Sequence, residues 1–208
     1  MSAYFSITLE FSHDELDYNT MDKLKVYLGH AGLHFRESYN TDRSYTADEV
    51  RDHNQKLLED NFELAEDQPY TEGYYQSLYD FGGFSEVRGI LLNNDPVEGE
   101  YSYKIIIPED EVVEYTSGGY RAIPEKAELI KELIRKMWLF PEIRTIQTGL
   151  ERTESITTEA DIRSGKLPSA CPFAIISERH FNCIDAGSFN TEKVDYGGVL
   201  LTLKSGTF

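Results

Sequence analysis

Residues 124–138 carry the clearest helical pattern in the chain, and this pattern limits the folds that the chain can adopt. Pro124 suits the first turn of a helix, and Pro141 marks its end. The apolar positions recur at helical spacing, and they are Ala127, Ile130, Leu133, Ile134, Met137 and Trp138. A helix with one broad apolar stripe must bury that stripe against another apolar surface. The rest of the chain therefore has to supply that surface.

Residues 4–11 offer such a surface, because their apolar side chains alternate with polar ones as in a half-buried strand. The apolar members are Phe5, Ile7, Leu9 and Phe11, and Ser6, Thr8 and Glu10 lie between them. Further strands are predicted at 33–35, 101–107, 112–115, 142–150, 172–177, 181–186 and 199–203, and residues 87–92 fit a strand or a short helix. A helix from Asn19 or Thr20 to Ala31 completes a strand–helix–strand opening.

These elements predict an α+β fold with a mixed, mostly antiparallel sheet and about three main helices. We expect one domain over residues 1–208, because no stretch resembles a flexible linker. The best candidate for a subdivision lies between Ile123 and Pro124, where an acidic part of the chain meets a charge-balanced part.

The charge of the chain is unevenly distributed along the sequence. The formal net charge is −17. Residues 1–123 carry 25 acidic and 9 basic side chains, whereas residues 124–208 carry 12 and 11. An acidic surface repels phosphates, which excludes a nucleic-acid binder that works by phosphate neutralisation. The segregation itself favours a docking surface for a basic partner, although a merely solvating acidic face stays open as an alternative.

The acidity peaks in a helix that we expect to run from Ala47 to about residue 67. Thr46 and Glu49 fit a capping box at its start. Glu59, Glu63 and Asp67 are spaced four residues apart, so their like charges destabilise the isolated helix. Such a helix needs either good packing or a supply of cations.

A tyrosine-rich segment, residues 69–84, follows this helix directly. It contains four tyrosines and two phenylalanines. Its rings either pack on the core, within a short helix or turn, or form an aromatic contact surface. Tyrosine suits the second role because it offers a large, rigid ring and a hydroxyl group.

No recognisable catalytic or metal-binding motif appears in the sequence. The chain has no zinc-protease signature, phosphate-binding glycine loop or nucleophile elbow. Cys171 and Cys183 are too far apart for a redox pair, and we expect Cys183 to be structural, inside the strand at 181–186. We therefore assign no catalytic residue, no metal and no cofactor. An enzyme with scattered catalytic groups stays open, and it would show a deep pocket with converging polar groups and a shifted pKa.

The sequence also lacks the usual signs of membrane insertion or secretion. No apolar run approaches the roughly 20 residues that span a bilayer. The first residues lack the basic region and the following apolar region that are typical of a signal peptide. Two cysteines are too few for a disulfide framework, so a cytoplasmic location is expected.

The acidic 48–67 segment, the tyrosine-rich 69–84 segment and the absence of catalytic motifs together resemble bacterial immunity proteins. Those are small, acidic, cytosolic α+β proteins that neutralise a cognate toxin. The resemblance is one of general character and covers roughly the first 123 residues. It implies that the chain occludes the active site or the nucleic-acid-binding site of a basic toxin.

We therefore predict a partner-binding surface made of acidic and aromatic side chains. Its members are Asp52, Glu59, Asp60, Glu63, Glu66, Asp67, Tyr70, Tyr74, Tyr75 and Tyr79. The expected partner is a basic protein, with no direct contact to nucleic acid and none to a membrane. An inhibitor that mimics nucleic acid, with spaced carboxylates in place of phosphates, is a further alternative.

Overall fold

The computed structural model describes residues 3–40, 43–61, 75–116, 119–151 and 156–204. The helices in these ranges are α1 (Thr20–His30), α2 (Ala47–Glu59), α3 (Pro124–Met137), α4 (Glu159–Arg163) and α5 (Glu178–Phe181). The strands are β1 (Tyr4–Ser12), β2 (His34–Asn40), β3 (Arg43–Tyr45), β4 (Gln76–Asp80), β5 (Arg88–Asn93), β6 (Glu100–Pro108), β7 (Val113–Thr116), β8 (Gly119–Ala122), β9 (Thr145–Leu150), β10 (Phe173–Ser177), β11 (Phe189–Val194) and β12 (Gly198–Leu203). Short 3-10 turns are η1 (His13–Glu15), η2 (Glu109–Glu111) and η3 (Ala186–Ser188).

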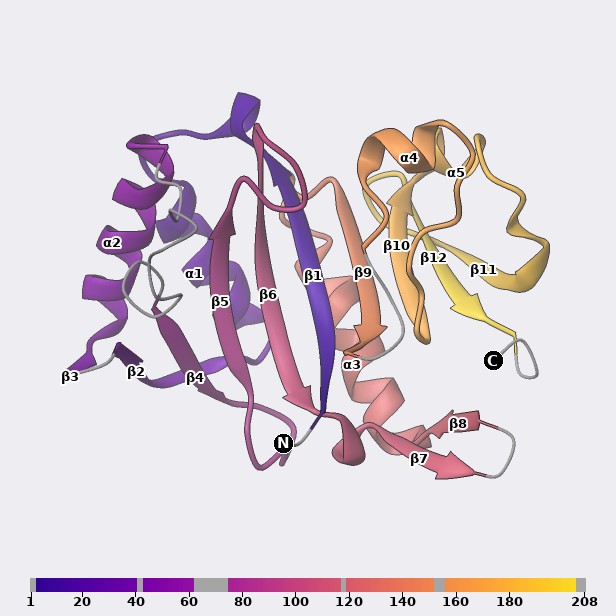
Figure 1. Cartoon of the computed structure of the whole chain (residues 1–208), viewed down its shortest axis with the longest axis horizontal. Coiled ribbons are helices and arrows are strands. Elements are labelled where there is room, and N and C mark those ends of the chain that lie inside the picture. The colour runs from indigo at the N-terminus through magenta and orange to yellow at the C-terminus, as the bar shows by residue number, and fades with distance from the viewer. Residues whose placement is uncertain (1–2, 41–42, 62–74, 117–118, 152–155, 205–208) are drawn as a thin grey trace.

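One large antiparallel sheet organises the molecule (Figure 1). Within the described ranges it has ten strands in the order β11-β12-β10-β9-β1-β6-β5-β4-β2-β3, and β7 and β8 form a separate hairpin. Three helices in those ranges, α1, α2 and α3, exceed seven residues. The predicted α+β class, the mostly antiparallel sheet and the number of main helices are confirmed.

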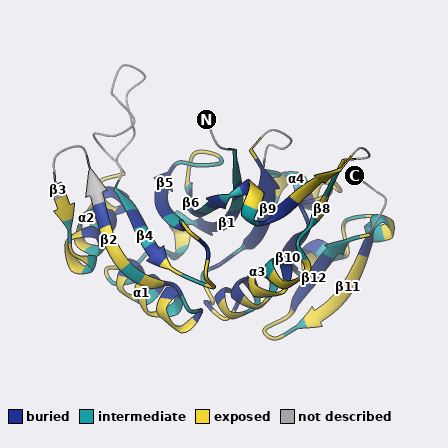
Figure 2. Cartoon of the chain, turned by 90° about the horizontal axis from the view of Figure 1, so that it is seen from below, coloured by how far each residue is buried: buried dark blue, intermediate teal, exposed yellow. Residues whose placement is uncertain are grey.

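The main core lies between the sheet and the long helices. The alternation in β1 sends Phe5, Ile7, Leu9 and Phe11 to the helix side, where each has an exposed fraction of 0%. There they belong to the same apolar cluster as the inward stripe of α3. Figure 2 shows α1 and α3 on the same side of the curved sheet. The two patterns that the sequence shows most clearly therefore pack in one core.

A smaller core lies on the opposite face of the sheet. Neighbouring residues of β10 separate into the two cores: Ile175 faces the long helices, whereas Ala174 and Ile176 pack with Ile162 of α4. Alternate side chains of a strand point to opposite faces, so β10 is covered on both. In Figure 1, α4 and α5 lie in front of β10 and β12, while α3 lies behind the sheet.

The order of the strands places the acidic part and the charge-balanced part of the chain on different sides of the sheet. Strands β9 to β12, from the charge-balanced part, fill one side of the sheet. Strands β1 to β6, from the acidic part, fill the other side, and the two sides meet where β1 pairs with β9. In Figure 1, α1, α2 and strands β2 to β5 of the acidic part lie on the left, whereas its β7–β8 hairpin lies at the lower right.

Two local predictions are wrong. The stretch 181–186, expected as a strand, instead comprises the end of α5 at Phe181, a turn at 182–185 and the start of η3 at Ala186. Ser177 caps α5 by accepting a hydrogen bond from the His180 backbone N–H. Cys183 is consequently exposed rather than buried in a strand. Residues 109–111 form η2, in which Glu109 is buried.

Candidate functional site

Helix α2 carries two of the predicted acidic residues, Asp52 and Glu59, and its start is built as expected. Thr46 Oγ1 accepts a hydrogen bond from the Glu49 backbone N–H at 3.3 Å, and Glu49 Oε2 accepts one from the Thr46 N–H at 2.8 Å. This capping box satisfies two N–H groups that the first turn leaves without helical partners. The buried face comprises Val50, Asn54, Leu57 and Leu58.

The end of α2 differs from the prediction. The helix stops at Glu59, with Asp60 as its C-cap, and does not reach residue 67. Asn61 adopts a left-handed backbone conformation, with φ of 47°. Asparagine tolerates that conformation better than most residues and commonly terminates helices there. The predicted site residues Glu63, Glu66, Asp67, Tyr70 and Tyr74 lie outside the described residues.

The carboxylates of α2 form one exposed surface, which we call the α2 acidic face: Asp48, Asp52, Glu59 and Asp60. Asp48, Asp52 and Glu59 are four and seven residues apart, so they share one stripe of the helix. Their stripe points away from the apolar face. Side-chain exposure is 65% for Asp48 and 71% for Asp52, which leaves both accessible to a partner.

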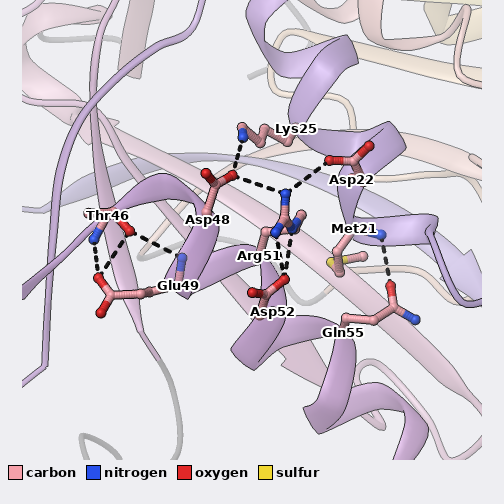
Figure 3. Close-up of polar contacts among 9 residues, drawn as sticks. All are labelled: Met21, Asp22, Lys25, Thr46, Asp48, Glu49, Arg51, Asp52 and Gln55. Carbon is pink, nitrogen blue, oxygen red and sulfur yellow. Dashed lines mark hydrogen bonds and ion pairs between the residues drawn. The ribbon is translucent and has the colours of Figure 1, made fainter.

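Cations from the same chain hold part of this surface together (Figure 3). Arg51 lies 3.0 Å from Asp48, 2.7 Å from Asp52 and 3.3 Å from Asp22 of α1. Lys25 of α1 lies 2.7 Å from Asp48. The hydrogen bond from Lys25 lowers the pKa of Asp48, so this carboxylate stays ionised at neutral pH.

These ion pairs explain how α2 tolerates its acidity. The three carboxylates around Arg51 and Lys25 leave only one net negative charge, and the same contacts tie α2 to α1. The unbalanced charge of the α2 acidic face therefore concentrates toward Glu59 and Asp60, where Lys56 is a distant partner at 4.0 Å from Asp60.

An aromatic stack lies beside the α2 acidic face. The Tyr75 ring stacks on His53 of α2, with ring centroids 3.9 Å apart, and on Tyr45, at 4.3 Å. All three residues are half-buried. His53 follows Asp52 directly in α2, so the structure brings one predicted tyrosine next to the predicted carboxylates.

Tyr79, in contrast, is a core residue, so its place in an exposed contact surface is a wrong prediction. It lies in β4 with an exposed fraction of 8%, and its hydroxyl is 2.6 Å from that of Tyr103. Alternation in β4 turns Ser77 and Tyr79 inward and Asp80 outward. The tyrosine-rich segment is therefore split between the surface and the core.

A second polar cluster, which the sequence did not reveal, lies on the face of the sheet away from the long helices. Glu10 of β1 is 1% exposed; its carboxylate accepts hydrogen bonds from the Thr145 hydroxyl at 2.5 Å and from the Glu159 N–H at 3.2 Å. Burial raises the pKa of Glu10. Burial and then the charge of Glu10 raise the pKa of neighbouring Glu100 to about 7. The charges of the two carboxyls repel each other, so the titration of one depends on the state of the other.

Glu159 and His180 continue this cluster. His180 Nε2 lies 2.9 Å from Glu159 Oε1, and this hydrogen bond, with another from Arg163 at 2.7 Å, lowers the pKa of Glu159 to about 2. His180 is 5% exposed, and its Nδ1 has no hydrogen-bond partner among the described residues. A crevice of about 220 Å³ is lined by both residues together with Glu15, Arg144, Trp138 and Tyr196.

The sequence contains little indication of the polar cluster around Glu10. Glu10 occupies a polar position of an alternating strand, but nothing local indicates that Glu100, Thr145 and Glu159 converge on it. Within the described ranges, no group of three or more histidine, cysteine, aspartate or glutamate residues is arranged to hold a metal ion.

No helix in the described ranges is both long and apolar enough to cross a membrane. Comparison with protein-family models, with curated proteins and with solved structures found no match to this chain.

Proposed function

We propose that this chain is a binding protein that docks a basic protein on the α2 acidic face and the adjoining Tyr45–Tyr75–His53 stack. By covering a basic surface, it occludes the partner's active site or nucleic-acid-binding site. The class that fits this role is an immunity protein acting in the bacterial cytoplasm against a cognate toxin. The observation that carries the proposal is that α2 bears both the exposed Asp52 and, at the next position, His53, on which Tyr75 stacks.

The acidic face supports rapid and selective association. Residues 1–123 carry 25 acidic and 9 basic side chains, and the exposed carboxylates of the α2 acidic face contribute a local negative field. Such a field raises association rates by about tenfold to a thousandfold at low salt. Because Arg51 already anchors Asp22, Asp48 and Asp52, these carboxylates are held in place before binding, which reduces the ordering cost.

The aromatic stack supports affinity rather than rate. Tyr75 is held between His53 and Tyr45, so its ring loses little freedom when a partner covers it. Rigid tyrosines at the centre of an interface commonly contribute about 2 kcal/mol or more on truncation.

Capture of the partner tests the proposal. The tagged full chain is incubated with lysate of its source organism at ~0.05 M and ~0.5 M salt, and bound proteins are identified by native mass spectrometry. We expect one basic protein in stoichiometric amount. The variant Asp52→Lys/Glu59→Lys/Asp60→Lys should lose it, whereas Glu98→Lys/Asp110→Lys/Glu125→Lys, an equal charge change elsewhere, should retain it.

The outcomes separate the alternatives. Equal capture by both triple variants contradicts the assignment of the surface. Recovery of many DNA-handling proteins favours the mimic of nucleic acid, and recovery of no basic protein contradicts a docking function.

A second candidate function is acid–base chemistry at the cluster of Glu10, Glu100, Glu159 and His180. The observation that favours it is the crevice lined by Glu159 and His180, since Glu159 donates its backbone N–H to Glu10, whose charge helps to raise the pKa of Glu100 to about 7. Chromogenic phosphate, ester and glycoside substrates test it. Hydrolysis that disappears in Glu100→Gln supports it, and the absence of hydrolysis of all three classes by the wild-type chain contradicts it.

A further inference from the structure

A cavity of about 310 Å³ lies beneath α2, between this helix, α1 and the sheet. Apolar side chains form its walls, chiefly Met21, Leu24 and Leu28 of α1 and Val50 of α2. Its volume falls within the lower range of known small-molecule sites, and its mixture of apolar walls with a few polar groups is typical of them. It faces the inner side of α2, whereas the α2 acidic face is on the outer side.

The hydroxyl groups at the base of this cavity are hydrogen-bonded to one another. Tyr79 and Tyr103 are 2.6 Å apart at their hydroxyls, and the buried Ser77 hydroxyl is a hydrogen-bond partner of both tyrosines. Gly89 permits this arrangement, because a Cβ at that position would lie 2.8 Å from the Tyr79 ring. The base of the cavity is therefore uncharged, and its hydroxyl groups do not need a ligand to complete their hydrogen bonds.

Asn54 is different, because its polar side chain lies on the apolar stripe of α2. It is four residues from both Val50 and Leu58, and its exposed fraction is 6%. Its Oδ1 has no hydrogen-bond partner among the described residues. A buried amide without a partner destabilises a folded protein, and leucine would fill the same position without that penalty. An unsatisfied group next to a cavity is a natural contact for a ligand.

The charged residues at the cavity restrict the ligand further. Lys25 and Arg51 line it, but both are already paired with Asp48. An anionic ligand would have to compete with those carboxylates. An uncharged ligand meets no such competition.

We propose that this cavity binds a small, uncharged, planar molecule whose apolar ring packs against α1 and whose amide-like edge pairs with Asn54. An amide edge presents a donor to Oδ1 and an acceptor to the Asn54 NH₂ group, so it can complete both halves of the side chain. This inference rests on the cavity and Asn54, and it stands whether or not the α2 acidic face docks a protein.

Benzamide is a suitable probe, and ethylbenzene is the matched probe without the amide. Binding to the full chain is measured by ¹H–¹⁵N NMR, including the side-chain NH₂ signals of Asn54. We expect benzamide to bind with Kd of about 1 mM or tighter, and more tightly than ethylbenzene. Failure of benzamide to shift signals of residues around the cavity would overturn the proposal.

The variant Asn54→Leu supplies the decisive comparison. It should weaken benzamide binding at least about tenfold and reverse the preference in favour of ethylbenzene, while raising Tm by about 2–4 °C. The control Asn190→Leu changes an exposed residue and should leave both affinities unchanged. Benzamide binding that is equally tight in Asn54→Leu overturns the role of Asn54.

Val50→Met keeps Asn54 but extends a longer side chain into the cavity. It should weaken both probes at least about tenfold. This variant decides the matter if Asn54→Leu does not fold. Unchanged binding in Val50→Met places the probe elsewhere and overturns the proposal.

Discussion

At the scale of single residues, the most unusual chemistry belongs to Glu10 and Glu100. Glu10 is held by the Thr145 hydroxyl and by the N–H at the start of α4, so it joins three elements. A carboxylate at a helix N-terminus is favourable, but a second carboxyl beside it in a partly buried site is not. A proton on Glu100, whose pKa is raised to about 7, relieves that repulsion, and this makes the cluster sensitive to pH.

Stability should therefore decrease as the pH rises from about 4.5 to about 7. The pKa of Glu100 is raised from 4.5 to about 7, so in this window the folded chain keeps a proton that the unfolded chain has released. The contribution is complete below the lower value and is lost as the pH passes through the higher one. Glu159 and Arg144 also act on Glu100, and the effect of Arg144 opposes that of the acids.

Urea unfolding at intervals from about pH 5 to about pH 8 measures this slope. Glu100→Gln cannot titrate and should show a flatter profile. Glu159 acts in a different range, because its pKa of about 2 gives stability that is lost only as the pH falls below 4.5. A wild-type profile identical to that of Glu100→Gln would contradict the raised pKa of Glu100.

At the scale of elements, α2 can carry many acidic residues because ion pairs link it to α1. Arg51 lies against Asp22 of α1 and two carboxylates of its own helix, and it is only 26% exposed. The stability of α2 therefore depends on an ion-pair network between two helices rather than on helix propensity alone.

Replacement of Arg51 by Met keeps the apolar part of the side chain and removes the charge. We expect a loss of about 1 kcal/mol in the free energy of unfolding at low salt, because three carboxylates then repel one another. The loss should shrink at ~1 M salt. Lys56→Met, at a position whose side chain is 77% exposed, is the control and should change stability by less than about 0.5 kcal/mol. Equal effects at both positions would contradict the network.

Two glycines give opposite predictions for the same substitution. A Cβ at Gly89 of β5 would lie 2.8 Å from the Tyr79 ring, so Gly89→Ala should destabilise the chain by about 1–3 kcal/mol. A Cβ at Gly29 of α1 meets nothing within 4 Å, so Gly29→Ala should stabilise it by about 0.5–1 kcal/mol. Thermal unfolding of both variants measures the difference, and a stabilising Gly89→Ala would contradict the tight packing of the tyrosine pair.

The elements differ in how far sequence could predict them. The strand at 4–11 and the helix from Pro124 were predictable because their periodicity is local and long. The structure at 181–186 was not, since Ser177 starts a helix of only four residues that ends at Phe181. The cluster around Glu10 was also hidden, because only the pairing of β1 with β6 and β9 brings its members together.

At the scale of the whole molecule, the sheet separates two kinds of surface. Strands from the acidic part lie on one side of the β1–β9 junction, and strands from the charge-balanced part lie on the other. Under the proposed function, the negative charge near α1 and α2 would orient a basic partner toward these helices before contact. This directional field is the central physical claim of the proposed function.

The association rate of the chain with its captured basic partner, measured at increasing ionic strength, tests this claim most directly. For the wild-type chain the rate should fall steeply with salt. Asp52→Lys/Glu59→Lys/Asp60→Lys should associate at least about tenfold more slowly at low salt, and Glu98→Lys/Asp110→Lys/Glu125→Lys much less so. If the first variant binds as fast as the wild-type chain at low salt, the α2 acidic face is not the docking surface.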